Sequence, residues 1–332
     1  MVERNLAKVE VASSNLVSRS KFENPVLKKT GFFYVRFKRK GKHKGNGVSA
    51  RLYSCVVILH AVRREVFMRV HSLFLYPVKS LAGIAVGSFE LDEFGPAGDR
   101  RWLVVDDECQ FVTQRTLPQL ALVQPSLGAG GEVSVTLPGA APIALHVSSE
   151  RLSVRVWRDW VQAQVGSDAA NAAISRFCGL SLRFVFMPES SFRQVQTNLA
   201  TERRRVSFAD GYPLLITNTA SLVELNERLA VTVDMRHFRP NIVVEGAAAW
   251  SEDNWQTVII GEGSYRVLTP CSRCVMTTIN PDTGEKAASA QPLRTLSTYR
   301  RTADGIMFGM NAIHNSPCRL SVGDCVIVNQ SE

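Results

Sequence analysis

Short apolar runs, separated by turn-forming residues, dominate the chain from Met68 onwards. Runs of this length, rich in β-branched and aromatic residues and bounded by Pro, Gly or Asp, are typical of β-barrels and β-sandwiches. In the first half of this region we expect strands over residues 70–76, 87–91, 102–106 and 111–114.

The later part of the chain returns to the same pattern. We expect strands over residues 242–244, 257–260, 265–268, 275–279 and 326–328. Between the two groups of strands, residues 125–142 are rich in Gly, Pro and Ala, which indicates a long loop or a hairpin tip.

Two segments carry helix signals. Ser167 can cap a helix that runs to Phe177, and Gly179 can end it in the left-handed conformation. Ser221 and Glu224 have the spacing of a capping box, and leucines at helical spacing follow. The sequence therefore predicts an α+β fold that is mostly β with a few helices, built from two β-rich units that meet along a cleft.

The basic character of the chain is confined to its first fifth. The formal net charge is +9, yet residues 1–67 hold fifteen Lys or Arg against four Glu and no Asp. The remainder is slightly acidic, so we do not expect a nucleic-acid binder. We expect residues 1–67 to be a disordered extension, or one foreign to the natural protein, upstream of a start at Met68. A nucleic-acid arm at residues 36–44 and a targeting peptide are the alternatives.

Length and cysteine content exclude several classes of protein. The 332 residues, 45% of them hydrophobic, can form one large or two ordinary globular domains. The longest apolar run, residues 55–62, is too short to span a bilayer and contains His60. Seven cysteines without a secretory signal argue against a disulfide framework. We therefore expect a cytoplasmic protein with no membrane span.

Cys271 and Cys274 form a C-x-x-C pair that has several interpretations. A structural zinc site would need a second close pair of ligands, and Cys318 and Cys325 are spaced too far apart to match one. A thioredoxin-type redox pair would begin a helix, whereas the following Val-Met-Thr-Thr-Ile predicts a strand. Metal or cofactor ligation, buried structural thiols and redox chemistry therefore stay open.

Cations and small polar residues gather at the predicted strand ends. They are Lys79, Ser80, Arg100, Arg101, Arg239, Asn241 and Arg273. Taken singly, each is an ordinary surface residue. If these strand ends converge, they form a nest that can hold a polyanion such as a phosphate.

Four ordered motifs then carry a family resemblance. They are Tyr-Pro-Val-Lys-Ser-Leu-Ala-Gly, Asp-Arg-Arg-Trp-Leu-Val-Val, Phe-Arg-Pro-Asn-Ile-Val-Val and Cys-Ser-Arg-Cys-Val-Met-Thr-Thr-Ile-Asn-Pro-Asp-Thr-Gly. With them the chain resembles proteins in which a MOSC N-terminal β-barrel domain precedes a MOSC domain, namely the bacterial YcbX-like proteins and the mitochondrial amidoxime-reducing components. The resemblance implies these two domains over residues 68–190 and 191–330, packed against each other.

The resemblance also implies a pyranopterin molybdenum cofactor. In the family the second Cys of Cys-Ser-Arg-Cys ligates molybdenum, which here is Cys274, and a soft thiolate suits such a metal. Cys271 has no ligand role in the family pattern. By the same resemblance, the pterin and its phosphate would be held by Lys79, Ser80, Arg100, Arg239, Asn241, Ser272 and Arg273.

Two further residues are expected in the same pocket. Asp210 matches an acidic residue near the metal, and we expect it to handle protons with a raised pKa; a turn cap before Gly211 is the alternative. Asn311 stands where eukaryotic members carry a Tyr, which puts the local shape of the pocket in question.

The activity that the resemblance implies is reduction of N-hydroxylated compounds: amidoximes, hydroxylamines and N-hydroxylated bases. The chain shows no flavin, dinucleotide or iron–sulfur fingerprint, so we expect a separate electron donor, a flavin reductase or a ferredoxin-like protein. MOSC domains also end molybdenum cofactor sulfurases. A cofactor or sulfur carrier without its own turnover is therefore the alternative function.

Overall fold

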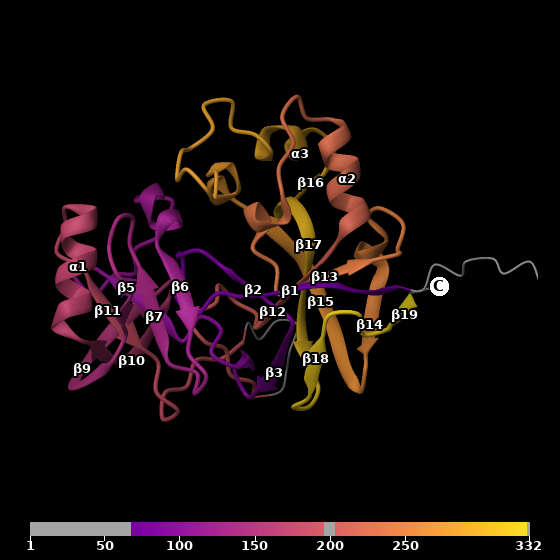
Figure 1. The fold of residues 1–332 in the computed structure, drawn as a ribbon. Coiled ribbons are helices and arrows are strands. Elements are labelled where there is room, and N and C mark those ends of the chain that lie inside the picture. The colour runs from indigo at the N-terminus through magenta and orange to yellow at the C-terminus, as the bar shows by residue number, and fades with distance from the viewer. Residues whose placement is uncertain (1–67, 196–202, 331–332) are drawn as a thin grey trace, which may run out of the picture. The chain divides into compact units, whose positions relative to one another are not determined.

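A computed structural model describes residues 68–195 and 203–330 (Figure 1). The predictions for the extension 1–67, including its alternatives as a nucleic-acid arm or targeting peptide, fall outside the described residues. Among the described residues, no helix has both the length and the apolar composition needed to cross a bilayer.

The largest element is a nine-stranded, mainly antiparallel sheet in the order β19-β14-β15-β17-β12-β13-β1-β2, with β16 paired to β17. Its strands are β1 (Arg69–Leu75), β2 (Ile84–Val86), β12 (Leu214–Asn218), β13 (Ile242–Glu245), β14 (Trp255–Ile260), β15 (Gly263–Arg273), β16 (Arg301–Thr302), β17 (Gly305–His314) and β19 (Val326–Gln330). The first described strand, β1, thus lies beside β13, far away in sequence. This pairing brings the loop after β1 to the same region as the loop before β13.

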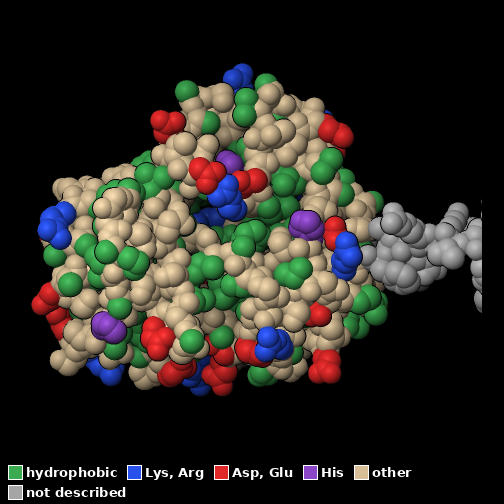
Figure 2. All heavy atoms as spheres, viewed as in Figure 1, with side chains coloured by type: hydrophobic (Ala, Val, Ile, Leu, Met, Phe, Trp, Pro, Cys, Tyr) green, Lys and Arg blue, Asp and Glu red, His purple; other side chains and the backbone are tan. Residues whose placement is uncertain are grey.

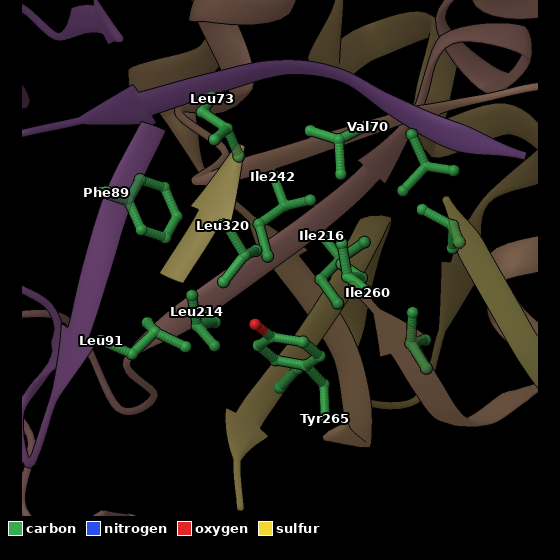
Figure 3. Packing of buried hydrophobic residues seen from close by; sticks show 14 of the residues in the cluster. Val70, Leu73, Phe89, Leu91, Leu214, Ile216, Ile242, Ile260, Tyr265 and Leu320 are labelled. Carbon is green, nitrogen blue, oxygen red and sulfur yellow. The ribbon is translucent and has the colours of Figure 1, made fainter. Parts of the chain in front are cut away.

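An apolar core packs against this sheet. Leu73, Ile216, Ile242 and Tyr265 are buried and point toward one another from four strands (Figure 3). The alternation of β1, buried at Val70, Leu73 and Leu75, follows the two-residue period of a strand with one buried face, offset once by a bulge.

Smaller sheets occupy the first half of the described chain. They are β5 (Trp102–Val105), β11 (Arg183–Phe186), β10 (Asp159–Gly166) and β9 (Val147–Val156); β6 (Gln124–Leu127), β7 (Val133–Thr136) and β8 (Ile143–Ala144); and β18 (Arg319–Ser321), β3 (Ser88–Asp92) and β4 (Gly95–Pro96). The first two have apolar clusters separate from that of the large sheet. The prediction of a mostly β, α+β fold is confirmed.

Helix α1 (Asp168–Cys178) begins and ends as predicted, with Ser167 at the N-cap position and Gly179 left-handed at φ 69°. Helix α2 (Thr219–Glu227) was predicted with the wrong start. Its cap is Asn218, whose side chain accepts from the Ala220 N–H at 3.0 Å. Ser221 is instead buried inside the helix and donates to the Glu252 carboxylate at 2.6 Å, so no capping box forms.

Two predicted strands are wrong. Residues 275–279 form the 3-10 helix η5 (Val275–Thr278), because the Thr277 and Thr278 hydroxyls bond back to the carbonyls of Cys274 and Val275. Residues 111–114 make a single bridge to Val105 and then turn. Residues 125–142 contain the β6–β7 hairpin, which settles the open choice there. The central strand β17 and helix α3 (Leu293–Tyr299) were not predicted.

Candidate functional site

A pocket opens where the loop after β1, Arg100 shortly before β5, the loop before β13 and the end of β15 meet. The cavity itself has a volume of about 130 Å³ and is open to solvent. Figure 2 shows one face of the molecule, where basic and acidic side chains meet around a hollow near the centre.

The structure brings all ten predicted site residues to this pocket. They are Lys79, Ser80, Arg100, Asp210, Arg239, Asn241, Ser272, Arg273, Cys274 and Asn311. Five Lys or Arg side chains line it against the single carboxylate of Asp210. The pocket is therefore suited to an anionic occupant. What each residue does there stays a prediction. Arg101, the remaining cation of the predicted nest, lies outside the pocket lining and donates to the Met187 carbonyl and to the Glu189 carboxylate.

Three of these residues have left-handed backbone conformations. The φ angles are 67° at Ser80, 51° at Arg100 and 54° at Arg239. Non-glycine residues rarely adopt this region, and such strain concentrates at functional sites. Ser80 lies in the loop after β1, Arg100 lies two residues before β5, and Arg239 follows the 3-10 helix η3 (Met235–Phe238), and all three line the pocket.

A buried tyrosine lies between two of the cations. The guanidinium carbons of Arg100 and Arg239 are 4.5 Å and 4.3 Å from the centre of the Tyr76 ring. Burial raises the pKa of Tyr76 to about 12, so the ring stays neutral. Loss of solvent lowers the pKa of Arg239 to about 10, and its buried Nη2 has no hydrogen-bond partner among the described residues. This guanidinium thus has an unused donor at the pocket.

Asn241 has a different position from the cations. Its amide oxygen accepts from Arg100 Nη1 at 3.2 Å and from the Leu215 N–H at 3.3 Å. Its amide nitrogen donates to the Phe74 carbonyl at 3.3 Å and to Asp99 at 3.2 Å. These four bonds use its hydrogen-bonding groups within the protein. Asn241 therefore holds Arg100 in place.

The two cysteines of the C-x-x-C pair differ in their surroundings. The Cys271 sulfur accepts from Arg273 Nη1 at 2.8 Å, whereas Cys274 is exposed and its thiol has no protein partner among the described residues. Cys274 lies where β15 ends and η5 begins, and its carbonyl oxygen accepts from the Thr277 hydroxyl at 2.9 Å. Cys274 is thus the thiol that is held open to the pocket.

The other lining residues of this segment are also defined. Arg273 donates to the Phe238 carbonyl, and its buried Nε has no partner among the described residues. Ser272 is exposed at the pocket, and Asn311 on β17 lies 3.4 Å from the Pro270 carbonyl. Within the described chain, no three His, Cys, Asp or Glu side chains come together as a possible metal site, and a zinc site on the cysteine pair finds no further ligands there.

Asp210 departs from the expectation of a raised pKa. Loss of solvent would raise its pKa, but the Lys79 ammonium and the Trp157 indole N–H outweigh this and hold it well below its usual range. Its side chain is still 70% exposed, so the loss of solvent is only partial and the two neighbouring donors determine the direction of the shift. Burial lowers the pKa of Lys79 to about 8, although Asp210 opposes this shift. Lys79 is therefore the group of this pair that titrates nearer to neutral pH.

Sequence reasoning missed Arg115, which lines the pocket, and Trp157, which contacts a residue of the lining. Arg115 places its guanidinium 4.6 Å from the Trp157 ring. Trp157 donates its indole N–H to Asp210 Oδ1 at 3.1 Å. Arg115 directly follows the strand predicted over residues 111–114, so it has the same strand-end signal as the other cations. Trp157 lies at the tip of the β9–β10 hairpin, and its sequence position gives no hint of Asp210.

Comparison with known proteins agrees with this architecture. Residues 67–181 match the MOSC N-terminal beta barrel domain, and residues 203–327 match the MOSC domain. The two matched regions together contain every residue that lines the pocket. Fold and site thus define a MOSC-domain protein in the form that has both domains.

Individual relatives narrow this class. Mitochondrial amidoxime-reducing component 1 of Mus musculus is 35% identical over 246 residues, which cover 70% of this chain and 71% of the relative. That of Homo sapiens is 32% identical over 279 residues, which cover 77% and 82%. The chain therefore belongs to the family of the amidoxime-reducing components. Molybdenum cofactor sulfurase of Oryza sativa subsp. japonica is 30% identical over 287 residues, 80% of this chain but only 35% of the sulfurase.

Proposed function

We propose that the protein binds a molybdenum cofactor through the Cys274 thiolate and reduces N-hydroxylated compounds such as amidoximes, hydroxylamines and N-hydroxylated bases. The observation that carries this proposal is one exposed thiol that has no partner in the described part of the chain and is held in a pocket lined by five cations. The names of two relatives, which describe them as amidoxime-reducing components, support the reaction class.

The donor set fits such a cofactor. A thiolate is the soft ligand that a sulfur-rich molybdenum centre takes. The buried Arg239 Nη2 and Arg273 Nε atoms, which lack partners among the described residues, suit a phosphate or the polar edge of a pterin. Ser80 and Ser272 would add hydroxyl donors, and Arg100, fixed by Asn241, would add charge.

In the proposed reaction the N–O bond is cleaved with two electrons and two protons, which gives the amine or amidine and water. The cofactor supplies electrons and a Lewis acid. The protein binds and orients the substrate and holds protons beside it. At neutral pH Lys79 carries a proton at Nζ next to the ionised Asp210, and the two form one hydrogen-bonded unit at the pocket.

Metal content and turnover together test this function. Protein made in a host that synthesises the cofactor should contain about one molybdenum per chain and reduce benzamidoxime to benzamidine with reduced methyl viologen as donor. Protein from a host without pterin synthesis is the control and should do neither. Stoichiometric metal without reduction of any N-hydroxylated compound would contradict the reductase proposal.

The rice sulfurase relative favours a second candidate, a carrier of the cofactor or of its sulfur without turnover. The chain spans about a third of that relative, so the sulfurase's own activity is not transferred. A carrier should release the bound pterin to an apo-enzyme, whereas a reductase should retain it through many turnovers. Transfer to an apo-molybdoenzyme, followed by that enzyme's activity, separates the two.

The electron donor and the compartment are part of the proposal. We propose a separate flavin reductase or ferredoxin-like donor and a cytoplasmic location. The names of two relatives place those proteins in mitochondria. Fractionation of the source cells with an antibody to residues 68–332 decides between the compartments, and co-purification followed by mass spectrometry identifies the donor.

A further inference from the structure

The two carboxylate oxygens of Asp210 have different surroundings. Oδ1 accepts from Lys79 Nζ and also from Trp157 Nε1, the latter at 3.1 Å. Among the described residues no hydrogen bond reaches Oδ2, although Asp210 lines the pocket and its side chain is 70% exposed. One oxygen is therefore fixed, while the other remains an available acceptor at the pocket.

This carboxylate accepts hydrogen bonds and does not donate them. The Lys79 ammonium keeps it ionised, and an ionised carboxylate has no proton to give. A substrate at this position must therefore bring a donor of its own, such as an N–H or O–H group. Bonds to a charged acceptor are stronger than those between neutral groups, so this contact can discriminate between substrates.

Trp157 fixes the carboxylate from another part of the fold. It lies at the tip of the β9–β10 hairpin in a left-handed conformation, φ 58°. Its ring centre is 5.1 Å from that of Phe111 and 4.6 Å from the Arg115 guanidinium. Such strain persists only where surrounding contacts hold it. Here those contacts aim the indole N–H at Asp210.

Arg193 makes a second link between the same two segments. This buried side chain donates from Nε to the Asp159 carboxylate at 2.7 Å and from Nη2 to the Asp210 carbonyl at 2.9 Å. Asp159 begins β10, two residues after Trp157. The β9–β10 hairpin is therefore linked to both the backbone carbonyl of Asp210, through Arg193, and its side chain, through Trp157.

We propose that Trp157 is a positioning residue that presents Oδ2 of Asp210 to the substrate, so that the pocket selects N-hydroxylated compounds with an N–H donor beside the N–O bond. Amidoximes and N-hydroxyguanidines have this donor, and aromatic N-oxides lack it. The proposal rests on the reductase function above and adds the feature that decides among its substrates.

The test compares Trp157→Phe, which keeps the ring but removes the N–H, with Trp160→Phe on the same hairpin. Trp160 is 60% exposed, and among the described residues it makes no hydrogen bond to Asp210. With the molybdenum-loaded enzyme and reduced methyl viologen, Trp157→Phe should raise KM for benzamidoxime about tenfold with little change in kcat. Its kinetic constants for pyridine N-oxide should stay within about twofold. Trp160→Phe should match the wild type with both substrates.

A binding measurement that needs no turnover accompanies the kinetics. Benzamidine, the amidine product, carries the same N–H donors, and Trp157→Phe should weaken its calorimetric Kd about tenfold while Trp160→Phe leaves it unchanged. Equal losses for benzamidoxime and pyridine N-oxide, or an unchanged benzamidine Kd, would overturn the proposal. If the wild type reduces neither substrate, the reductase function fails, and the benzamidine result still decides the role of Trp157.

Discussion

The chemistry of the pocket depends on how single residues are held. Cys271 and Cys274 are three positions apart, yet Arg273 engages the first sulfur at 2.8 Å and leaves the second without a protein partner. Lys79 and Asp210 likewise share one hydrogen bond, yet burial lowers the pKa of Lys79 to about 8, while the Lys79 ammonium and the Trp157 N–H hold the pKa of Asp210 well below its usual range. In both pairs, the groups that surround each side chain determine the role that we propose for it, more than its residue type does.

The cysteine pair gives the first prediction. Cys274→Ala should contain less than about a tenth of the wild-type molybdenum, because the replacement removes the proposed thiolate ligand. Cys271→Ala, the matched control, should keep its metal. The measurement is metal per chain by mass spectrometry in protein from a cofactor-producing host. Metal retained in both variants would mean that neither thiol is the ligand.

The lysine gives a pH dependence. The Lys79 pKa of about 8 means that its positive charge is present at pH 6.5 and mostly lost at pH 9.5. The cofactor-free protein should therefore bind sulfate, which stays fully ionised, about fivefold more weakly at the higher pH. Calorimetry at the two pH values measures this. Lys79→Met should lose most of the dependence and keep only the smaller part that comes from Arg239, whose pKa is about 10. Lys286→Met, which lies outside the pocket lining, should keep all of it.

At the scale of elements, the pairing of strands determines which loops form the pocket, and local hydrogen bonds fix the helices beside the sheet. The β1–β13 pairing brings Lys79 and Arg239 to one pocket although 160 positions separate them in sequence. Helix α2 directly follows strand β12, and Asn218 at the junction caps the helix. The Asn218 side chain also donates to the Ala248 carbonyl at 2.7 Å and to Glu252 at 3.1 Å.

This cap predicts a stability effect. Asn218→Ala should lower the free energy of unfolding by about 2 kcal/mol, because it removes a helix cap and leaves the buried Glu252 without one of its donors. Val223→Ala, on the exposed face of the same helix, should change it by less than about 0.5 kcal/mol. Urea unfolding followed by circular dichroism measures both. Equal effects of the two substitutions on the free energy of unfolding would contradict the stabilising role that we assign to the Asn218 cap.

Local patterns predicted part of these elements. Strands such as β1 and β14 alternate or carry β-branched runs, and α1 has both a cap and a terminal glycine, so the sequence determined them. The Val-Met-Thr-Thr-Ile run has the same propensities, but its threonine hydroxyls bond to backbone carbonyls and close a 3-10 turn. Strand β17 has buried residues on both faces and two glycines, so neither strand alternation nor helix periodicity marks it.

The candidate site was predictable for a related reason. Its cations sit in contiguous motifs at strand ends, so the set could be assembled before the strands were placed. Trp157 could not be predicted, because it lies 53 positions before Asp210 in the sequence and the two meet only through the fold. The prediction of a raised pKa for Asp210 was wrong for the same reason, since this pKa depends on Lys79, which lies 131 positions away in the sequence.

At the scale of the whole molecule, all residues that line the pocket lie between positions 79 and 311. A variant that starts at Met68 should therefore keep its molybdenum and its benzamidoxime turnover within about twofold of the full chain. Cofactor content and reductase rate on the purified variant check this, beside a full-length preparation from the same host. A shortened protein that cannot fold would show that residues 1–67 belong to the working molecule.

The two guanidinium groups that contact Tyr76, those of Arg100 and Arg239, have a consequence for how long the protein survives in a cell. Like charges so close together repel one another, and an anionic cofactor that binds only the native state adds to its stability by mass action. Chains without cofactor would open more often and present themselves to proteases. We therefore expect the half-life of this protein in vivo to shorten when molybdate is withdrawn from the medium, so that its abundance reports the cell's supply of the metal. A pulse-chase in molybdate-free and molybdate-supplemented cultures that gave equal half-lives would contradict this.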